Sequence, residues 1–285
     1  MQATNEQNIA VVCNPMAGNG RAVELAKKLV TELCQRNIPN KIFQENWPAH
    51  FDSFSTVFIV GGDGTLNYFI NLYPQIKVPL AIFRGGSGND IHWLLYGDKS
   101  FAQQLEVVLT THPRPVDAGQ CNGRLFINGV GIGFDGAVAK SLTGKNKLPG
   151  KTSFLIVILR KIFLYRSAVY QISSDELSEQ SRQLLIGVAN GRRAGGGFFI
   201  APEAIATDGL LDVILVNAIR PLKRLRYLPV IEKGKHLHLP FIKYFKTKSI
   251  CIVSDTLIQA HLDGEYYSDT RLRIEILPRR FLFLY

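Results

Sequence analysis

Three short apolar segments in the first part of the chain each run into a glycine-rich turn, and this pattern constrains the fold most strongly. The segments are Ile9–Cys13, Val57–Val60 and Val78–Phe83. Helix-like segments follow the turns at Arg21–Gln35, at Leu66–Leu72 and from about Ile91. Strand, turn and helix repeated in this order predict a parallel sheet with helices on its faces.

The turns indicate that the backbone lies close to another group. Gly61-Gly62-Asp63-Gly64-Thr65 has three glycines in four positions, and Gly85–Asp90 has three more. Amides at the carboxyl ends of parallel strands can hold a polyanion, and a carboxylate such as that of Asp63 can bind magnesium there. Asn14–Gly20 is not a Walker A sequence and, by itself, fits an ordinary strand-to-helix turn equally well. Asn89 and Asp90 are candidates for capping the third helix.

From about Pro115 the chain changes to short strand-like segments, many of them separated by glycine or Asx residues. These segments are Leu125–Asn128, Leu184–Ala189, Leu211–Val216, Ser249–Val253, Ile258–Leu262 and Leu272–Leu277. Only Lys151–Tyr165 and Pro221–Lys233 have a helical pattern. We therefore predict an α/β domain over residues 1–118 and a mostly antiparallel β domain over residues 119–285.

Three further motifs in the second part have both a chemical and a structural interpretation. Glycines alternate through Asn128–Asp135, which indicates a bulge or a cleft wall close to a ligand, and Asp135 is functional or a helix cap. The loop Ala201–Val213, with Asp208 beside a glycine, could chelate a hard cation or form a hairpin. Asp263 and Glu265 flank Gly264 and could face the same way, one binding metal and the other accepting a proton, or they belong to a simple hairpin.

The composition favours an anionic partner and a reducing compartment. The 33 lysines and arginines exceed the 23 acids, for a net charge of +10. The four cysteines form no CxxC pair, and Cys13 and Cys251 lie in apolar runs that suggest burial.

The polar N-terminus does not resemble a signal peptide, and the longest apolar run, Phe154–Leu159, is too short to span a bilayer. We expect a cytoplasmic protein.

One basic stretch also favours a membrane surface. Arg220–Lys248 contains nine lysines and arginines against one acid, Glu232, with aromatic and aliphatic residues interleaved. This mixture is typical of an anionic bilayer interface, at the inner membrane face for a cytoplasmic protein, although a solvated basic face over core residues would have the same composition. Lys151–Arg166 is similarly open to a role in the core or in a lipid-binding wall. No DNA- or RNA-binding motif is recognised, so nucleic acid is not an expected partner.

Taken in order, the motifs Asn14–Gly20, Gly61–Thr65, Gly85–Asp90, Asn128–Asp135, Ala201–Val213 and Asp263–Glu265 resemble the diacylglycerol kinase catalytic family. The resemblance covers nearly the whole chain and is strongest to the bacterial branch of soluble diacylglycerol kinases and YegS-like lipid kinases. It implies an α/β nucleotide-binding domain, followed by a β-sandwich lipid-substrate domain whose last strand could return to the first domain. The implied activity is ATP- and Mg²⁺-dependent phosphorylation of a lipid hydroxyl.

The resemblance also assigns roles to residues. Asp63 would lie near the catalytic magnesium, and Glu265, with Asp263 beside it, would be the general base. A structural magnesium would be held by the carboxylate of Asp208 and the carbonyls of Ile205 and Leu210. The ATP-binding residues would be Asn14, Gly18, Gly20, Gly61, Gly62, Gly64, Thr65, Asn67, Gly86, Ser87, Gly88, Asn89 and Asp90, with Ser87 in place of the threonine usual in the family.

One further departure and two alternative functions accompany this assignment. The family's threonine near the second strand has no counterpart, because Gln44, Glu45 and Asn46 occupy that region. The acceptor lipid and a homodimer are left open by the sequence. NAD kinase shares the Gly-Gly-Asp-Gly-Thr element and the two-domain plan, but it typically has an Asn-Glu pair where this chain has Asn89-Asp90. A catalytically silent nucleotide- or lipid-binding protein is the second alternative, against which Asp63, Asp90, Asp263 and Glu265 together argue.

Overall fold

The computed structural model describes the backbone of residues 7–143 and 151–285 and the side chains of residues 7–143 and 156–285. The chain forms two compact units. Unit 1 consists of the chain up to Val116 together with Arg279–Tyr285, and unit 2 runs from Asp117 to Pro278. The chain passes from one unit to the other within two strands, β5 (Arg114–Cys121) and β13 (Glu265–Phe283).

Unit 1 has a parallel sheet in the order β4-β3-β1-β2, as the repeated strand–turn–helix pattern predicts. Its strands are β1 (Ile9–Cys13), β2 (Asn40–Phe43), β3 (Thr56–Gly61) and β4 (Leu80–Arg84). Every residue of β1 is buried, because helices cover both faces of the sheet. The end of β13 pairs in parallel with β4, where Phe283 lies opposite Leu80.

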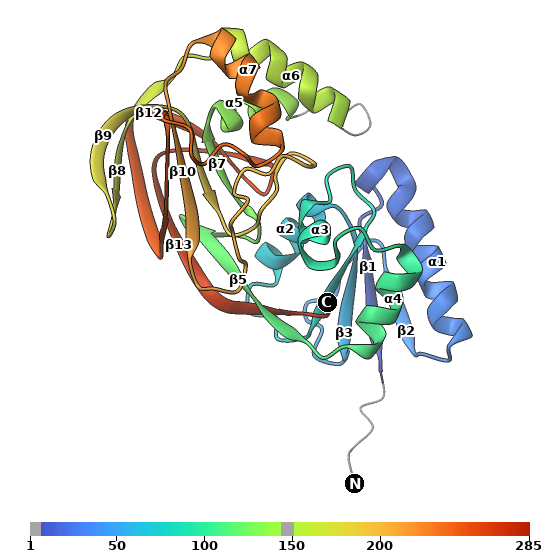
Figure 1. The fold of residues 1–285 in the computed structure, drawn as a ribbon. Helices are drawn as coiled ribbons and strands as arrows, with labels where there is room; N and C mark the ends of the chain where they lie inside the picture. Colours follow the sequence, from blue (N-terminus) through green and yellow to red (C-terminus); the bar gives the residue numbers. More distant parts are fainter. Residues whose placement is uncertain (1–6, 144–150) are drawn as a thin grey trace. The chain divides into compact units, whose positions relative to one another are not determined.

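The first three helices of unit 1 start close to the glycine turns, and a fourth follows them. They are α1 (Arg21–Gln35), α2 (Asp63–Leu72), α3 (Asp90–Tyr96) and α4 (Phe101–Thr110), with a short 3-10 segment, η1, at Ala17–Gly20. Figure 1 shows α1 and α2 on opposite sides of the strands. The sequence analysis did not predict α4, although Ser100 and Gln103 form a capping box at its start.

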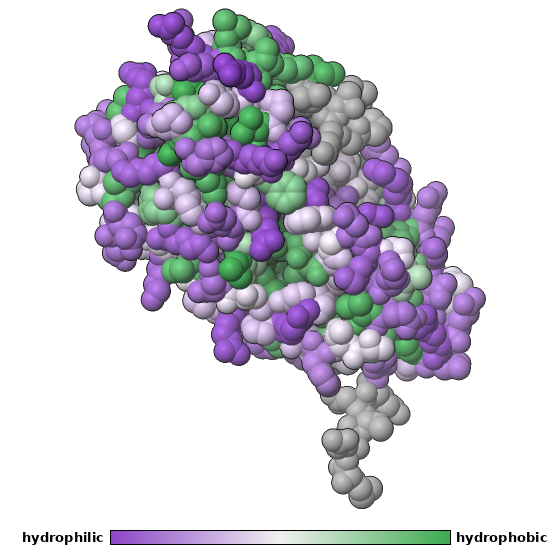
Figure 2. Space-filling view, in the orientation of Figure 1, coloured by the Kyte–Doolittle hydropathy of each residue, from purple (hydrophilic) through white to green (hydrophobic). Residues whose placement is uncertain are grey.

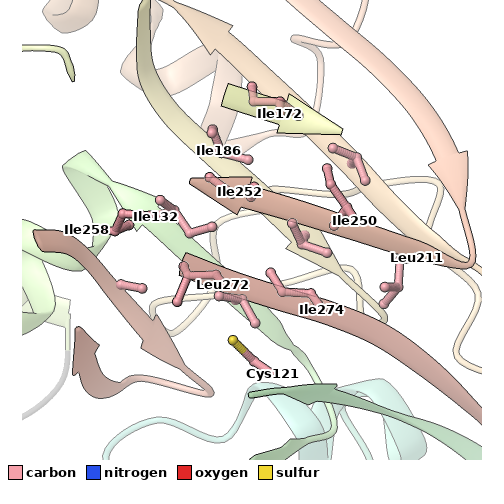
Figure 3. Close-up of a cluster of buried hydrophobic side chains, with 14 of the residues drawn as sticks. Cys121, Ile132, Ile172, Ile186, Leu211, Ile250, Ile252, Ile258, Leu272 and Ile274 are labelled. Carbon is pink, nitrogen blue, oxygen red and sulfur yellow. The ribbon is translucent and has the colours of Figure 1, made fainter. Parts of the chain in front are cut away.

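Unit 2 is antiparallel, as predicted, with strands in the order β11-β10-β9-β7-β12-β13. The strands not yet given are β6 (Arg124–Phe126), β7 (Gly129–Gly133), β8 (Ala168–Ser174), β9 (Ser178–Ala189), β10 (Leu211–Asn217), β11 (Ile242–Thr247) and β12 (Ser249–Leu262). A core of isoleucine, leucine and valine side chains fills the space that these strands enclose (Figure 3). Burial of this apolar surface is the main contribution to the stability of the unit.

Two expectations for unit 2 were wrong. Ser249–Val253 and Ile258–Leu262 are not separate strands but the two ends of β12, which shifts register between Val253 and Ile258 while staying paired with β13. Cys251 is only half-buried, whereas Cys121 is buried in the core along with Cys13 in unit 1. Burial raises the pKa of the Cys13 thiol to about 11, so this cysteine behaves as a small apolar residue.

Three helices complete unit 2: α5 (Phe134–Leu142), α6 (Lys151–Leu164) and α7 (Pro221–Glu232). The last two agree with the predicted helices to within a residue, and α5 was not predicted. None of the helices in the described parts of the chain is long and apolar enough to cross a membrane.

Candidate functional site

The three glycine turns of unit 1 pack directly against one another, backbone to backbone. A Cβ on Gly18 would overlap the carbonyl oxygen of Gly85, and one on Gly62 would lie 2.8 Å from the carbonyl oxygen of Gly88. A Cβ on Gly86 would overlap Gly62 in the same way. Glycine is therefore required here by the contact between turns, and the result is a continuous backbone surface at the carboxyl ends of β1, β3 and β4.

The first turn is fixed by its conformation and by one side chain. Gly18 and Gly20 have φ of +60° and +90°, in the left-handed region that favours glycine. Asn14 donates from Nδ2 to Oγ1 of Thr65 at 3.3 Å and accepts the amide of Met16 at 3.0 Å. Asn14–Gly20 is therefore more than an ordinary strand-to-helix turn, because the side chain of Asn14 bonds it to the second turn.

Asp63 connects the second turn to the third. Its two carboxylate oxygens each accept a backbone N–H at 3.0 Å, from Asp90 and from Ile91. These amides are the unpaired donors at the start of α3, where a carboxylate is favourable. The expectation that the side chain of Asn89 caps this helix was wrong: Asn89 occupies the N-cap position, but its side chain bonds with the backbone of Gly86, and Asp90 is the first residue of the helix.

The residues predicted to bind ATP all belong to unit 1, and the three turns bring most of them together. Ser87 is exposed at the tip of the third turn, Asp63 is half-buried and Asp90 is buried. Asn67 lies one helical turn into α2, where its carbonyl accepts the side chain of Asn71. Exposed and half-exposed amides at three adjoining turns can bind several oxygens of a polyphosphate.

Asp263 and Glu265 belong to unit 2 and do not face the same way. The carboxylate of Asp263 is buried and accepts the amides of Ile127, Asn128 and Gly129 at 2.8 to 3.0 Å. It thereby fixes the turn between β6 and β7 to the β12–β13 hairpin. Glu265, the first residue of β13, is exposed. Of the two acids, Glu265 is the one available to a substrate.

Beside this hairpin the structure adds a pair that the sequence analysis missed. His261 Nε2 lies 2.9 Å from Oδ2 of Asp135, and its Nδ1 accepts the amide of Gly264 at 3.1 Å. Burial opposes protonation of His261, but Asp135, and more weakly Asp263 and Glu265, raise its pKa above the ordinary value. The alternating glycines were a signal for this pair, because a Cβ on Gly131 would overlap both side chains.

Unit 2 also contains an apolar cavity. Its lining comes from β9, β10, the helices α5, α6 and α7 and the loops around them, and it includes Phe134, Ile158, Ile162, Ile214, Val216 and Leu228. The polar side chains in the lining are those of Asp135, Arg224, Tyr227 and His236. Burial lowers the pKa of His236, whose Nε2 lies 3.0 Å from the carbonyl oxygen of Ile200, so the imidazole is neutral at pH 7. The cavity therefore suits a hydrocarbon.

Arg224 brings a charge to the cavity, but its Nε and Nη1 groups bond to the protein itself. Its guanidinium donates to the carbonyls of Ile162, Tyr165 and Ile219 at 2.8 to 2.9 Å. Two of these carbonyls lie at the end of α6, where a cation is favourable. Arg224 thus ties α7 to α6 over the cavity.

The loop Ala201–Asp212 does not fit the structural magnesium that the resemblance implies. Asp208 Oδ2 lies 2.8 Å from the ammonium of Lys246, which is also 3.6 Å from Oδ2 of the buried Asp212. The other Asp208 oxygen accepts the amide of Leu210, and the carbonyl of Ile205 accepts two amides of the same loop. No group of three or more His, Cys, Asp or Glu side chains suited to a metal occurs in the described parts of the chain. Lys246 supplies the positive charge at this loop.

Comparison with known proteins agrees with this architecture. The family model for the diacylglycerol kinase catalytic domain matches residues 8–121, and that for the YegS C-terminal NAD kinase beta sandwich-like domain matches residues 128–284. The chain therefore belongs to the lipid kinase family built from these two domains.

Among its relatives, a Pseudomonas syringae pv. syringae protein called "Probable lipid kinase YegS-like" is 30% identical, over 76% of this chain and 72% of its own. A Mycobacterium tuberculosis diacylglycerol kinase is 25% identical, over 95% and 92%. The crystal structure of a diacylglycerol kinase from Bacillus anthracis str. Sterne has a TM-score of 0.75, covering 99% of this chain and 98% of its own, and at 23% identity it supports the fold alone.

Proposed function

We propose that this protein transfers the γ-phosphate of ATP to the hydroxyl group of a lipid, with Mg²⁺ as the metal. The glycine turns of unit 1 would bind the triphosphate through their amides, which is how a protein holds a polyanion without covalent chemistry. The likeness to proteins named lipid kinase and diacylglycerol kinase supports the reaction class.

Asp63 fits the part of magnesium ligand. Magnesium in phosphoryl-transfer sites is held by one or two carboxylates together with substrate phosphates. Each oxygen of Asp63 accepts one amide, and the side chain is half-buried at the edge of the sheet, beside the glycine turns. When bound, the ion would neutralise charge on the transferring phosphate.

Glu265 would act as the general base. It would take the proton of the lipid hydroxyl, whose oxygen forms a bond to the γ-phosphorus while the bond to the β-γ bridging oxygen breaks and ADP leaves. Asp263, whose carboxylate is occupied by three amides, would hold the hairpin that carries Glu265.

The main structural support for a lipid acceptor is the apolar cavity of unit 2. Nineteen residues line it and only three of them bear side chains that titrate near or carry charge at neutral pH: Asp135, Arg224 and His236. Since Nε and Nη1 of Arg224 are engaged by carbonyls and most of the lining is apolar, the cavity suits an alkyl chain better than the ribose and pyrophosphate groups of NAD. This favours a lipid kinase over an NAD kinase.

The test is transfer of labelled γ-phosphate from ATP with Mg²⁺ to a panel of hydroxyl lipids in mixed micelles, with NAD as control. We expect a labelled lipid, loss of product when EDTA removes the metal, and at least about 100-fold lower kcat in Asp63→Asn and Glu265→Gln. Labelled NAD would contradict the proposal. Absence of any product, with retained ATP binding, would favour a catalytically silent binding protein.

A further inference from the structure

Helix α6 is apolar on two opposite faces. Ile158 and Ile162 are buried, and both line the cavity. The outer face carries side chains that are 38 to 65% exposed: Ile156, Leu159, Phe163 and Leu164. These residues recur at the i, i+3, i+7, i+8 spacing of a single helical face. A helix of a protein in water normally has a polar outer face, so this one is built for an apolar partner.

Helix α7 extends the same surface. Leu222 and Leu225 are 74% and 41% exposed, and Arg224 ties this helix to the end of α6. Figure 1 shows α6 and α7 side by side, and in the same orientation Figure 2 shows hydrophobic residues gathered over α6 with hydrophilic ones beside them. We call the exposed apolar side chains of these two helices, with the cations among them, the α6–α7 face.

The charges on the α6–α7 face have one sign. Among the side chains that the structure describes, its exposed cations are Arg160, Lys223 and Arg226 on the helices and Arg166 and Arg220 next to their ends. Neither helix carries an acidic residue before Glu232, the last residue of α7. A surface that combines aliphatic side chains with arginine and lysine complements a bilayer with anionic headgroups.

Part of the basic stretch Arg220–Lys248, which the sequence suggested as a membrane surface, is not available for membrane contact. Phe241, Ile242 and Tyr244 pack against a buried cluster of unit 2 rather than facing outward. Lys243 pairs with Glu179 at 2.9 Å, and Lys246 is held at the Asp208 loop. The α7 part of Arg220–Lys248 stays exposed, and the outer face of α6 adds its apolar side chains to it.

From these observations we infer that the α6–α7 face docks on an anionic lipid bilayer. A second copy of this chain is the less favourable occupant, because a symmetric contact would bring the same five cations together in a desolvated interface. The two helices also cover the cavity, with their inner residues Ile158, Ile162 and Leu228 in its lining. If the proposed lipid kinase function holds, docking brings the membrane within one helix layer of the acceptor's binding cavity.

The test is co-sedimentation of the full chain with vesicles of phosphatidylcholine alone or with about 30% phosphatidylglycerol. We expect binding to the anionic vesicles only, weakened steeply by 0.5 M salt because the attraction is screened. Lys223→Glu with Arg226→Glu should reduce the partition coefficient at least tenfold, and Leu159→Ser with Phe163→Ser should do so in a separate protein. These side chains are exposed and line no cavity, so both variants should keep the wild-type melting temperature.

Matched changes in unit 1 serve as controls. Lys27→Glu with Lys77→Glu changes the net charge by the same amount on exposed residues, and Leu72→Ser removes an apolar side chain that is 48% exposed. Equal loss of binding in these controls, binding to neutral vesicles that the variants do not change, or a concentration-dependent dimer that Phe163→Ser dissociates would each overturn the inference.

The two proposals fail separately. Vesicle binding needs no turnover, so a wild-type protein that docks but phosphorylates no lipid would contradict only the kinase proposal. Conversely, docking variants should keep wild-type activity on lipid dispersed in neutral detergent micelles and lose it on anionic vesicles. Wild-type activity on both would contradict the docking inference alone.

Discussion

The two candidate subsites of this protein are built in different ways. In unit 1 the glycine turns form a surface of backbone atoms, and each turn is contiguous in sequence. In unit 2 the cavity is lined by residues of β9, β10, three helices and the loops around them, from Phe134 to Phe241. A backbone site tolerates almost no added atom, whereas a cavity lined by aliphatic side chains can change in shape and keep the fold. The predictions below test this contrast.

The largest effect is expected from Gly86→Ala. The added Cβ would meet the backbone of Gly62, which cannot move without displacing both turns. We expect a loss of about 3 kcal/mol in unfolding free energy and at least a tenfold weaker affinity for ATP. Gly187→Ala in β9 is the control, because its Cβ would have no neighbour closer than 3.4 Å. Chemical denaturation and nucleotide titration of both variants would measure these effects. Equal effects of Gly86→Ala and Gly187→Ala would contradict the proposed difference between the backbone site and the cavity.

Lys246→Met tests the loop that the resemblance assigned to magnesium. Burial raises the pKa of Asp212, while the hydroxyl of Tyr244 at 2.5 Å and the ammonium of Lys246 act against it. Removing the ammonium should cost about 2 kcal/mol. Lys243→Met, at the more exposed pair with Glu179, should cost less than about 1 kcal/mol.

The same variant addresses the metal directly. Magnesium should not change the melting temperature of the wild-type protein through this loop, because the ammonium already holds Asp208. In Lys246→Met it should raise the melting temperature, as the two carboxylates then lack a cation. Stabilisation of the wild type by Mg²⁺ that disappears in Asp208→Asn would show that the loop binds metal as it is.

Val216→Phe tests how far the cavity can change. Val216 is buried on β10 and lines the cavity, so the larger ring would take up space that a long acyl chain needs. We expect KM for a long-chain acceptor to rise about tenfold, or about 1.4 kcal/mol, with KM for ATP unchanged. Val169→Phe on β8, at an exposed position, should change neither constant. A rise in KM for ATP in Val216→Phe would contradict the assignment of the cavity to the lipid.

The smallest effect concerns pH and applies to both units. His92 in unit 1 and His236 in unit 2 are buried, and burial lowers the pKa of each below its ordinary value of 6.5. Their contribution to stability is therefore complete above pH 6.5 and is lost as the pH falls through the lowered folded-state pKa values. His92→Gln and His236→Gln should each make unfolding free energy depend less on pH between 7.5 and 5. The unfolding free energy would be measured by urea denaturation at each pH. If its pH dependence is the same in the variants as in the wild type, groups other than these two histidines determine it.

Much of unit 1 could be predicted because its signals are local. The bounds of β1 and α1 agree with the prediction residue for residue, since an apolar run and a 3.6-residue period are properties of neighbouring residues. The glycine turns were recognised for the same reason. The reason for their glycines was only partly recognised. The sequence suggested close approach to a ligand, whereas the structure shows that the turns also contact one another.

In unit 2 the sequence was less informative because the decisive contacts join distant segments. His261 and Asp135 are 126 positions apart, and the amides that occupy Asp263 lie 134 to 136 positions before it. The two ends of β12 looked like two strands, because no local pattern shows that both pair with β13. Helix α6 was recognised as apolar, but which of its faces is buried depends on what packs against it.

The sequence by itself determined the three strand–turn–helix repeats of the first part, the antiparallel character of the second part, and the carboxylates that chemistry could use. Tertiary structure alone decided that Asp63 caps α3, that Lys246 lies at the Asp208 loop, and that an apolar cavity lies beneath α6 and α7. The physical reason is distance along the chain. Conformational preference and hydrophobic periodicity act between neighbours, whereas capping, ion pairing and cavity formation depend on which remote segments folding brings together.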